Sequence, residues 1–142
     1  MIEDELTYKI IGCAMKVHNT LGPGFQEVIY QRCLAIELQK VGLSFLREKE
    51  QKIYYEGTEV GTRRADFVVE NQVVIEIKAV TNLEDVHIAQ AKNDVIAYDF
   101  PRGLLINFGA QSLQKNGYLI RSERRIELHP AFRSLSIDER VV

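Results

Sequence analysis

Two segments near the start of the chain carry apolar residues at helical spacing. They run from Glu5 to about Asn19 and from about Phe25 to Val41, and in each the apolar residues recur three or four positions apart. The recurring residues are Leu6, Ile10, Ala14 and Val17 in the first segment and Tyr30, Leu34, Leu38 and Val41 in the second. The glycines and proline of residues 21–24 separate the two predicted helices.

The middle of the chain is rich in β-branched residues and predicts a β-hairpin. Residues 65–69 and 73–80 are nearly continuous apolar runs, and three polar residues between them supply the turn. The second run is apolar except for Glu76 and Lys78, which is typical of a strand covered on both faces. Since side chains alternate along a strand, these two charged residues are expected to share one face.

Further strands and one more helix are predicted around this hairpin. Residues 45–55 predict a strand before it, and a capping-box pattern at residues 81–84 predicts a helix that runs to about Tyr98. Residues 103–108 predict a buried strand, parallel to the second hairpin strand because a helix connects the two, and residues 117–121 predict an edge strand. We therefore expect an α/β protein with a mixed sheet of four to five strands flanked by helices.

Composition and charge set only broad limits. The length of 142 residues favours a single domain over residues 1–142. The content of 46% hydrophobic and 27% charged residues is ordinary for a globular protein. The acidic first ten residues and the lack of a long apolar run predict a cytoplasmic protein without a membrane segment. Cys13 and Cys33 stand alone in the helical segments and predict reduced core thiols. A net charge of −2 argues against coating nucleic acid through bulk charge but allows a local basic groove.

Charged residues on the two central strands predict a metal site. Asp66 and Glu76 place one carboxylate on each strand, and with the backbone carbonyl of Ile77 they form a ligand set suited to Mg²⁺. Such a cation polarises a phosphoryl oxygen and lowers the pKa of an attacking water. Lys78 orients or deprotonates that water, or neutralises charge in the transition state. The alternative is a buried salt bridge between Lys78 and one of the acids, with no metal, although such buried ion groups are rarely needed for stability.

Four further residues are candidates for the same site. Glu27 lies in line with the apolar stripe of the second helix, where it either binds a second metal or outer-sphere water, or simply favours the helix dipole. Arg63 and Arg64 precede the first carboxylate and are placed to contact a substrate phosphate. Gln90 reaches back towards the central strand if the face of the third helix that carries it packs on the sheet. That predicted face consists of Val86, Ala89, Gln90, Asp94 and Ala97.

Over residues 6–121 the chain resembles the GxxExxY family in the order and spacing of five segments. These segments are LGPGFQEVIY, RRADFVV, VVIEIKAV, HIAQ and GLLINF. This family is assigned to the PD-(D/E)XK nuclease-like superfamily, which implies a restriction-endonuclease-like core and cleavage of phosphodiesters with Mg²⁺ or Mn²⁺. The resemblance implies catalytic roles for Glu27, Asp66, Glu76, Lys78 and Gln90. The helix after Gln90 is more polar than that family's pattern, and residues 122–142 form a C-terminal extension beyond it.

The leading hypothesis is a Mg²⁺-dependent nuclease that acts on DNA or RNA, with a homodimer as a plausible assembly. Substrate contacts are assigned to Tyr30, Arg63, Arg64 and His87. A non-cutting nucleic-acid-binding or assembly module with the same fold is the first alternative, and a phosphohydrolase acting on small nucleotides is the second.

Overall fold

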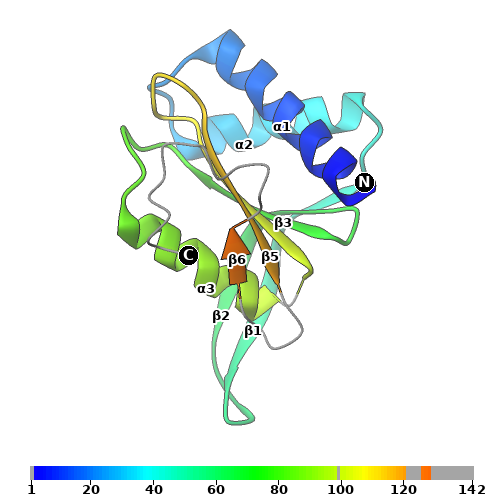
Figure 1. The fold of residues 1–142 in the computed structure, drawn as a ribbon, viewed down its shortest axis with the longest axis vertical. Helices are drawn as coiled ribbons and strands as arrows, with labels where there is room; N and C mark the ends of the chain where they lie inside the picture. Colours follow the sequence, from blue (N-terminus) through cyan, green and yellow to red (C-terminus); the bar gives the residue numbers. More distant parts are fainter. Residues whose placement is uncertain (1, 99, 121–125, 129–142) are drawn as a thin grey trace.

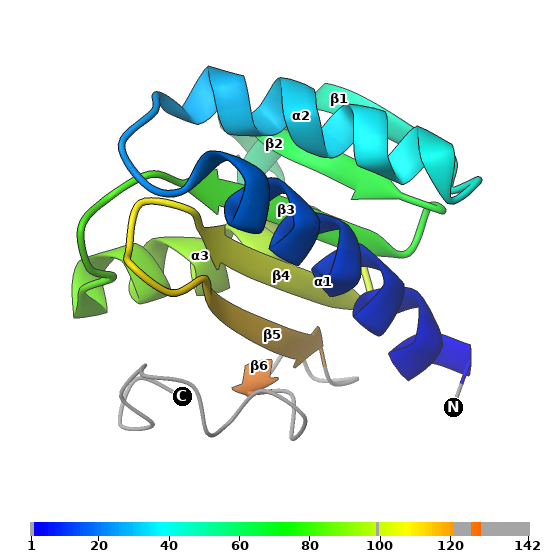
Figure 2. The ribbon, with the colours of Figure 1, turned by 90° about the horizontal axis from the view of Figure 1, so that it is seen from above.

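Three helices cover the two faces of one sheet. Helix α1 spans Ile2–Leu21 and α2 spans Glu27–Lys40, and both lie on the same face of the sheet. Helix α3, Asp85–Tyr98, packs on the opposite face (Figures 1 and 2). The computed structural model describes residues 2–98, 100–120 and 126–128.

The sheet has six strands among the described residues, arranged in chain order from β1 to β6. Neighbouring strands are antiparallel except β3 and β4, which are parallel and joined through α3. This confirms the α/β class and the mixed sheet flanked by helices. The strands are β1 Phe45–Tyr55, β2 Thr58–Val69, β3 Val73–Lys78, β4 Arg102–Asn107, β5 Gln114–Ile120 and the short β6 Ile126–Leu128.

The main core lies between the sheet and the first two helices. The predicted stripes of α1 and α2 pack there, except that Leu6 is only partly buried and Val41 lies beyond the end of α2 and is 41% exposed. The strands contribute alternate residues, so the faces of β3 separate as expected: Ile75 and Ile77 enter this core, while Glu76 and Lys78 point to the α3 side. The buried helix residues of this core are Ile10, Ile11, Cys13, Ala14, Val17, Tyr30, Leu34, Ala35 and Leu38.

Both cysteine thiols are free. Cys13 is buried and Cys33 is partly buried, and both contact the core between the sheet and the first two helices. None of the described helices is long and apolar enough to cross a membrane.

Strands β1 and β2 form a long hairpin whose outer part extends away from the body of the protein (Figure 1). We call residues 49–64 the arm. Strand β2 is continuous from Thr58 to Val69, so it begins before the strand predicted at residues 65–69, and its first half belongs to the arm. The turn between the two strands uses Glu56 and Gly57, both with positive φ.

Two boundaries differ from the sequence prediction. Strand β5 begins at Gln114 rather than at residue 117, and it is an interior strand because β6 pairs with its outer edge. Since β6 lies at residues 126–128, part of the predicted C-terminal extension belongs to the sheet. Arg121 and most of that extension lie outside the described residues.

The start of α3 also differs from the predicted capping box. The backbone N–H of Glu84 donates to Nδ1 of His87 at 2.9 Å, and the helix begins at Asp85. His87, three residues after Glu84, therefore supplies the capping side chain. The cap lies three residues later in the chain than the pattern at residues 81–84 predicts.

A buried amide network holds the loop that follows β3. Asn107 Oδ1 accepts from the backbone N–H groups of Val80 and Gly109, while its Nδ2 donates to the Val80 carbonyl and to Gln114 Oε1. Asn107 thus uses two donors and two acceptors without solvent exposure. Gln114 Oε1 also accepts from the backbone of Leu83, which ties the loop to β5.

Gly109 allows this loop to approach closely. A Cβ at this position would lie 2.5 Å from backbone atoms of Ala79 and Val80. We expect Gly109→Ala to lower the free energy of unfolding by about 1–3 kcal/mol, because the backbone must shift to admit one methyl group. Urea denaturation measures the change.

Gly12→Ala is the matched control, because an added Cβ there meets nothing within 4 Å in the interior of α1. This substitution should raise stability by about 0.5–1 kcal/mol through helix propensity. Equal effects at the two glycines would contradict the close approach at Gly109.

Candidate functional site

The central feature of the site is the point at which β2 and β3 separate. Their pairing runs from Val69↔Val73 only as far as Phe67↔Ile75. Asp66 is the next residue of β2, and its Oδ2 accepts a hydrogen bond of 2.7 Å from the backbone N–H of Ile77. The carboxylate therefore supplies the acceptor for a buried strand N–H group at the place where the ladder ends.

The second oxygen of this carboxylate is held from α2. Gln31 Nε2 donates to Asp66 Oδ1 at 3.0 Å, and Gln31 Oε1 accepts from Arg47 at 2.8 Å. Gln31 is buried, and the sequence interpretation missed it. A signal was present, because Gln31 is a polar residue one helical turn after Glu27, within the apolar stripe of α2.

Burial and neighbouring charges set the ionisation of Asp66. Burial raises the pKa of this carboxyl, whereas the hydrogen bonds from Ile77 and Gln31 favour the charged form and lower it. The negative charge of Glu27 raises the same pKa and the positive charge of Lys78 lowers it. Glu27 and Lys78 therefore both lie within electrostatic reach of Asp66, although Glu27 itself is exposed at the first turn of α2.

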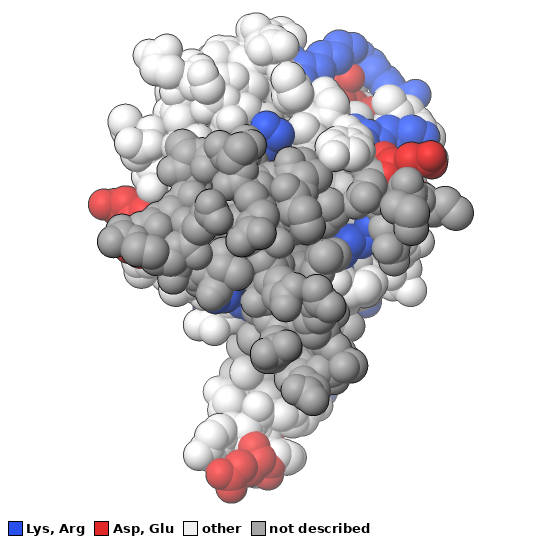
Figure 3. All heavy atoms as spheres, in the orientation of Figure 1, with Lys and Arg blue, Asp and Glu red and all other residues white. Residues whose placement is uncertain are grey.

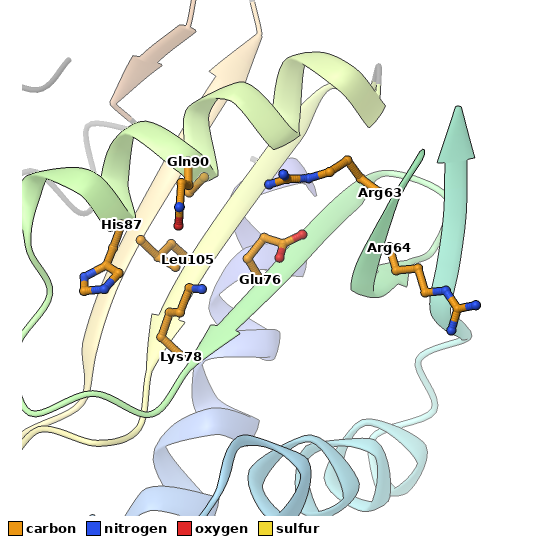
Figure 4. A pocket seen from close by; sticks show the side chains of 8 residues that line it. Arg63, Arg64, Glu76, Lys78, His87, Gln90 and Leu105 are labelled. Atoms are coloured by element: carbon orange, nitrogen blue, oxygen red, sulfur yellow. The ribbon is translucent and has the colours of Figure 1, made fainter. Parts of the chain in front are cut away.

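A cleft between α3 and the sheet contains most of the other candidates (Figure 4). Glu76 and Lys78 enter it from β3, and one carboxylate oxygen of Glu76 is fully buried. Arg63 and Arg64 both line the cleft from β2. The Arg63 side chain points into it, whereas the Arg64 guanidinium points away and lies 3.9 Å from Glu48. The remaining lining residues are His87, Gln90 and Ala91 of α3 and Leu105 of β4.

The candidates thus form two adjoining groups. Asp66 is held on the α2 side with Glu27 nearby, and Glu76 lies in the cleft on the α3 side. Lys78 is common to both groups, since it lines the cleft and its charge acts on Asp66. Within residues 2–98, 100–120 and 126–128, no group of three His, Cys, Asp or Glu side chains converges on one metal position.

Tyr30 has a different position from the one the sequence suggested. Its side chain has no exposed surface and stacks on Phe108 with ring centroids 4.8 Å apart. The hydroxyl donates to the Gly22 carbonyl at 2.6 Å and accepts from the Phe25 N–H at 3.2 Å. Tyr30 therefore anchors the loop from which α2 and Glu27 begin, and this burial argues against a direct substrate contact.

Helix α3 presents a different face to the sheet from the predicted one. Ile88 and Ala91 are buried, whereas Val86 is 55% exposed, so the helix is rotated relative to the expected stripe. Gln90 is exposed but lines the cleft, as does the half-buried His87. The Nδ1 atom of His87 accepts the hydrogen bond of the cap from the Glu84 N–H, so Nε2 is the ring nitrogen that this cap does not use.

Comparison with known proteins places this architecture in a family. Residues 4–122 match the family model described as the PD-(D/E)XK nuclease superfamily. The chain belongs to the PD-(D/E)XK nuclease superfamily. Asp66 on β2 and Glu76-Ile77-Lys78 on β3 match the D and the (D/E)XK of that name in order, whereas Ala65 stands in the place of its proline. No curated protein and no solved structure matches the chain.

The raised pKa of Asp66 predicts a pH dependence of stability. The unfolded chain ionises this carboxyl near its ordinary pKa of 3.8, and the folded chain ionises it only at a higher pH. Between these two values the folded state binds more protons, so the contribution of Asp66 to the free energy of unfolding falls as pH rises and stays low above the folded pKa.

We expect Asp66→Asn to remove this decrease in the free energy of unfolding, because asparagine does not ionise. Relative to wild type, the variant should gain stability as pH rises from about 4 to 7, measured by urea denaturation in EDTA. A stability difference between the two proteins that is constant over this range would contradict the raised pKa.

The role of Gln31 can be tested through the same carboxyl. Gln31→Leu removes a hydrogen bond to the charged form, so the pKa of Asp66 should rise further. A carboxyl-carbon NMR titration measures this pKa directly. Gln39→Leu, on the exposed side of α2, should leave it unchanged. An unaltered Asp66 titration in Gln31→Leu would refute the role assigned to Gln31.

Proposed function

We propose that this chain is a metal-dependent nuclease that hydrolyses phosphodiester bonds in DNA or RNA. The observation that carries the proposal is the entry of Glu76, Lys78 and Arg63 into one cleft, where the charge of Lys78 also acts on Asp66. A carboxylate and two cationic side chains in a partly enclosed site suit a phosphate diester, whose negative charge increases in the transition state.

The donor chemistry fits Mg²⁺ or Mn²⁺. Asp66 and Glu76 supply carboxylates, and the Ile77 carbonyl supplies a neutral oxygen, with Glu27 available for a second cation or its water. Burial raises the pKa of Asp66, and a bound cation would favour its charged form. When bound, the metal would polarise a phosphoryl oxygen and lower the pKa of a coordinated water.

The side chains have separable roles in this proposal. The Lys78 ammonium orients the attacking water and offsets negative charge as the phosphorane-like transition state forms. Arg63 contacts a phosphate oxygen from β2, while Gln90 and His87 line the side of the cleft formed by α3. Arg64 points away from the cleft, so we assign the phosphate contact to Arg63.

We further propose membership of the GxxExxY group within the superfamily. Support comes from the motif Gly24–Tyr30, in which Gly24 has a φ of 110° and Tyr30 anchors the loop. The first and last residues of the motif thereby hold the start of α2, and the glutamate between them is the one whose charge acts on Asp66.

A non-cutting binding module is the second candidate. It is favoured by one observation: both Asp66 oxygens already accept hydrogen bonds, from Ile77 and Gln31, and the two carboxylates lie in separate groups. In that case the carboxylate serves to hold the strands apart, and the cleft binds phosphate without metal.

Cleavage assays separate the two candidates. Wild type should cut single- or double-stranded DNA or RNA only with Mg²⁺ or Mn²⁺, and Asp66→Ala and Lys78→Met should each reduce the rate by about 10²-fold or more. Lys52→Met is the matched control, because Glu50-Gln51-Lys52 repeats the E-x-K spacing on the exposed strand β1.

Metal-dependent cutting that survives Lys78→Met would refute the catalytic assignment. A wild type that binds these nucleic acids without cutting any of them, or bis(p-nitrophenyl) phosphate, would favour the binding module.

A further inference from the structure

The arm is a second surface that continues from the cleft. Lys49 pairs with Ala65, which is buried on the α3 side, and its ammonium lies 5.4 Å from the centre of the Phe100 ring. Further out, Gln51 pairs with Arg63, the residue that points into the cleft (Figure 4). Both pairs therefore belong to the face of the arm that adjoins the cleft.

Because side chains alternate along β1, the cleft-side face of the arm continues to the end of this strand. The register shifts between Ile53 and Tyr54, but the additional residue is Val60 on β2, so β1 itself alternates without interruption. Tyr55 therefore shares the cleft-side face with Gln51, and Tyr54 lies on the opposite face. The two tyrosines are 68% and 60% exposed, respectively.

Charges separate between the two faces of the arm. The outer face carries both signs and forms exposed ion pairs, Lys52 with Glu59 at 3.7 Å and Arg64 with Glu48 at the base of the arm at 3.9 Å. On the cleft side, the charged residues of the paired arm strands are Lys49 and Arg63, and both are basic. Acidic side chains gather instead at the tip, residues 56–59, which limits how far a polyanion extends (Figure 3).

We propose that the cleft-side face of the arm binds an unpaired segment of the nucleic-acid substrate, with a base stacked on Tyr55. The inference rests on the proposed function and names the substrate class as single-stranded DNA or RNA. An exposed tyrosine ring stacks on a base whose face is free, which a duplex does not offer. Stacking also supplies affinity that a chain of net charge −2 does not obtain from bulk electrostatics.

The dimensions fit a short segment. Tyr55 lies four residues beyond Gln51, a span of roughly 13 Å along a strand, which corresponds to about four stacked nucleotides. Such a segment would have its phosphates near Lys49 and Arg63 and would lead into the cleft at Glu76 and Lys78.

Adjacent tyrosines on opposite faces provide a matched test. Fluorescence anisotropy with labelled single-stranded DNA and RNA, in EDTA so that no cleavage occurs, should show about 5- to 100-fold weaker binding for Tyr55→Ala. Tyr54→Ala should bind as wild type does, and Tyr55→Phe should retain binding because it keeps the ring. Duplex binding should be unaffected by all three substitutions.

The chain contains no tryptophan, so single-tryptophan reporters give an independent readout. The fluorescence of Tyr55→Trp should be quenched by single strands, and that of Tyr54→Trp should not. Equal effects at the two positions, or loss of binding in Tyr55→Phe, would overturn the proposal. So would sedimentation showing that Tyr55→Ala dissociates a dimer, since the arm would then contact a second copy of the chain.

These outcomes are independent of the nuclease assay. Tyr55-dependent binding without any cleavage would support the arm and refute the nuclease. Cleavage of single strands that is equally fast in Tyr55→Ala, at substrate concentrations below KM, would support the nuclease and refute the arm.

Discussion

The hydrogen bond from the Ile77 N–H group to Asp66 determines how the sheet and the site are joined. It lies where β2 stops pairing with β3, and the carboxylate takes the position of the missing backbone acceptor. Beyond this point β2 pairs with β1 as the arm, while β3 continues alone against β4. The structure therefore holds a partly buried carboxylate whose pKa is raised by its burial, at a cost to stability where that carboxyl is ionised.

Where the pairing of β2 with β3 ends, the side chains of β1 and β2 also change the face of the sheet to which they point. Phe67 and Arg47 face the α1–α2 side, whereas Ala65 and Lys49, two positions along each strand, face α3. The residues between them absorb the change: Glu48 has a φ of 51° and Asp66 turns its side chain towards β3 and α2. As a result, one hairpin contributes a buried core face near its base and a cleft-side face along the arm.

The helical period and the strand alternation of apolar residues predicted the secondary-structure elements, because both patterns reflect which side chains are buried. The stripes of α1 and α2 and the two faces of β3 were predictable for that reason. Strict alternation does not hold where β1 and β2 change face, and it could not show that Asp66 turns towards Gln31, 35 residues away. The pairing of β6 likewise depends on tertiary contacts that leave no local pattern. The cap at His87 is a local contact, but histidine is not the glutamate or glutamine that the capping-box pattern requires.

The G-x-x-E-x-x-Y motif illustrates how a functional signature is largely architectural. Its glycine and tyrosine shape and anchor a loop, so the glutamate acquires its position relative to Asp66 without being buried. A mutation of Tyr30 would therefore disturb the placement of α2 and Glu27, although the ring does not line the cleft and has no exposed surface. Conversely, Gln31 lies outside the motif but donates a hydrogen bond to Asp66 directly, so a residue's relation to this carboxylate is better judged from its hydrogen bonds than from the motif.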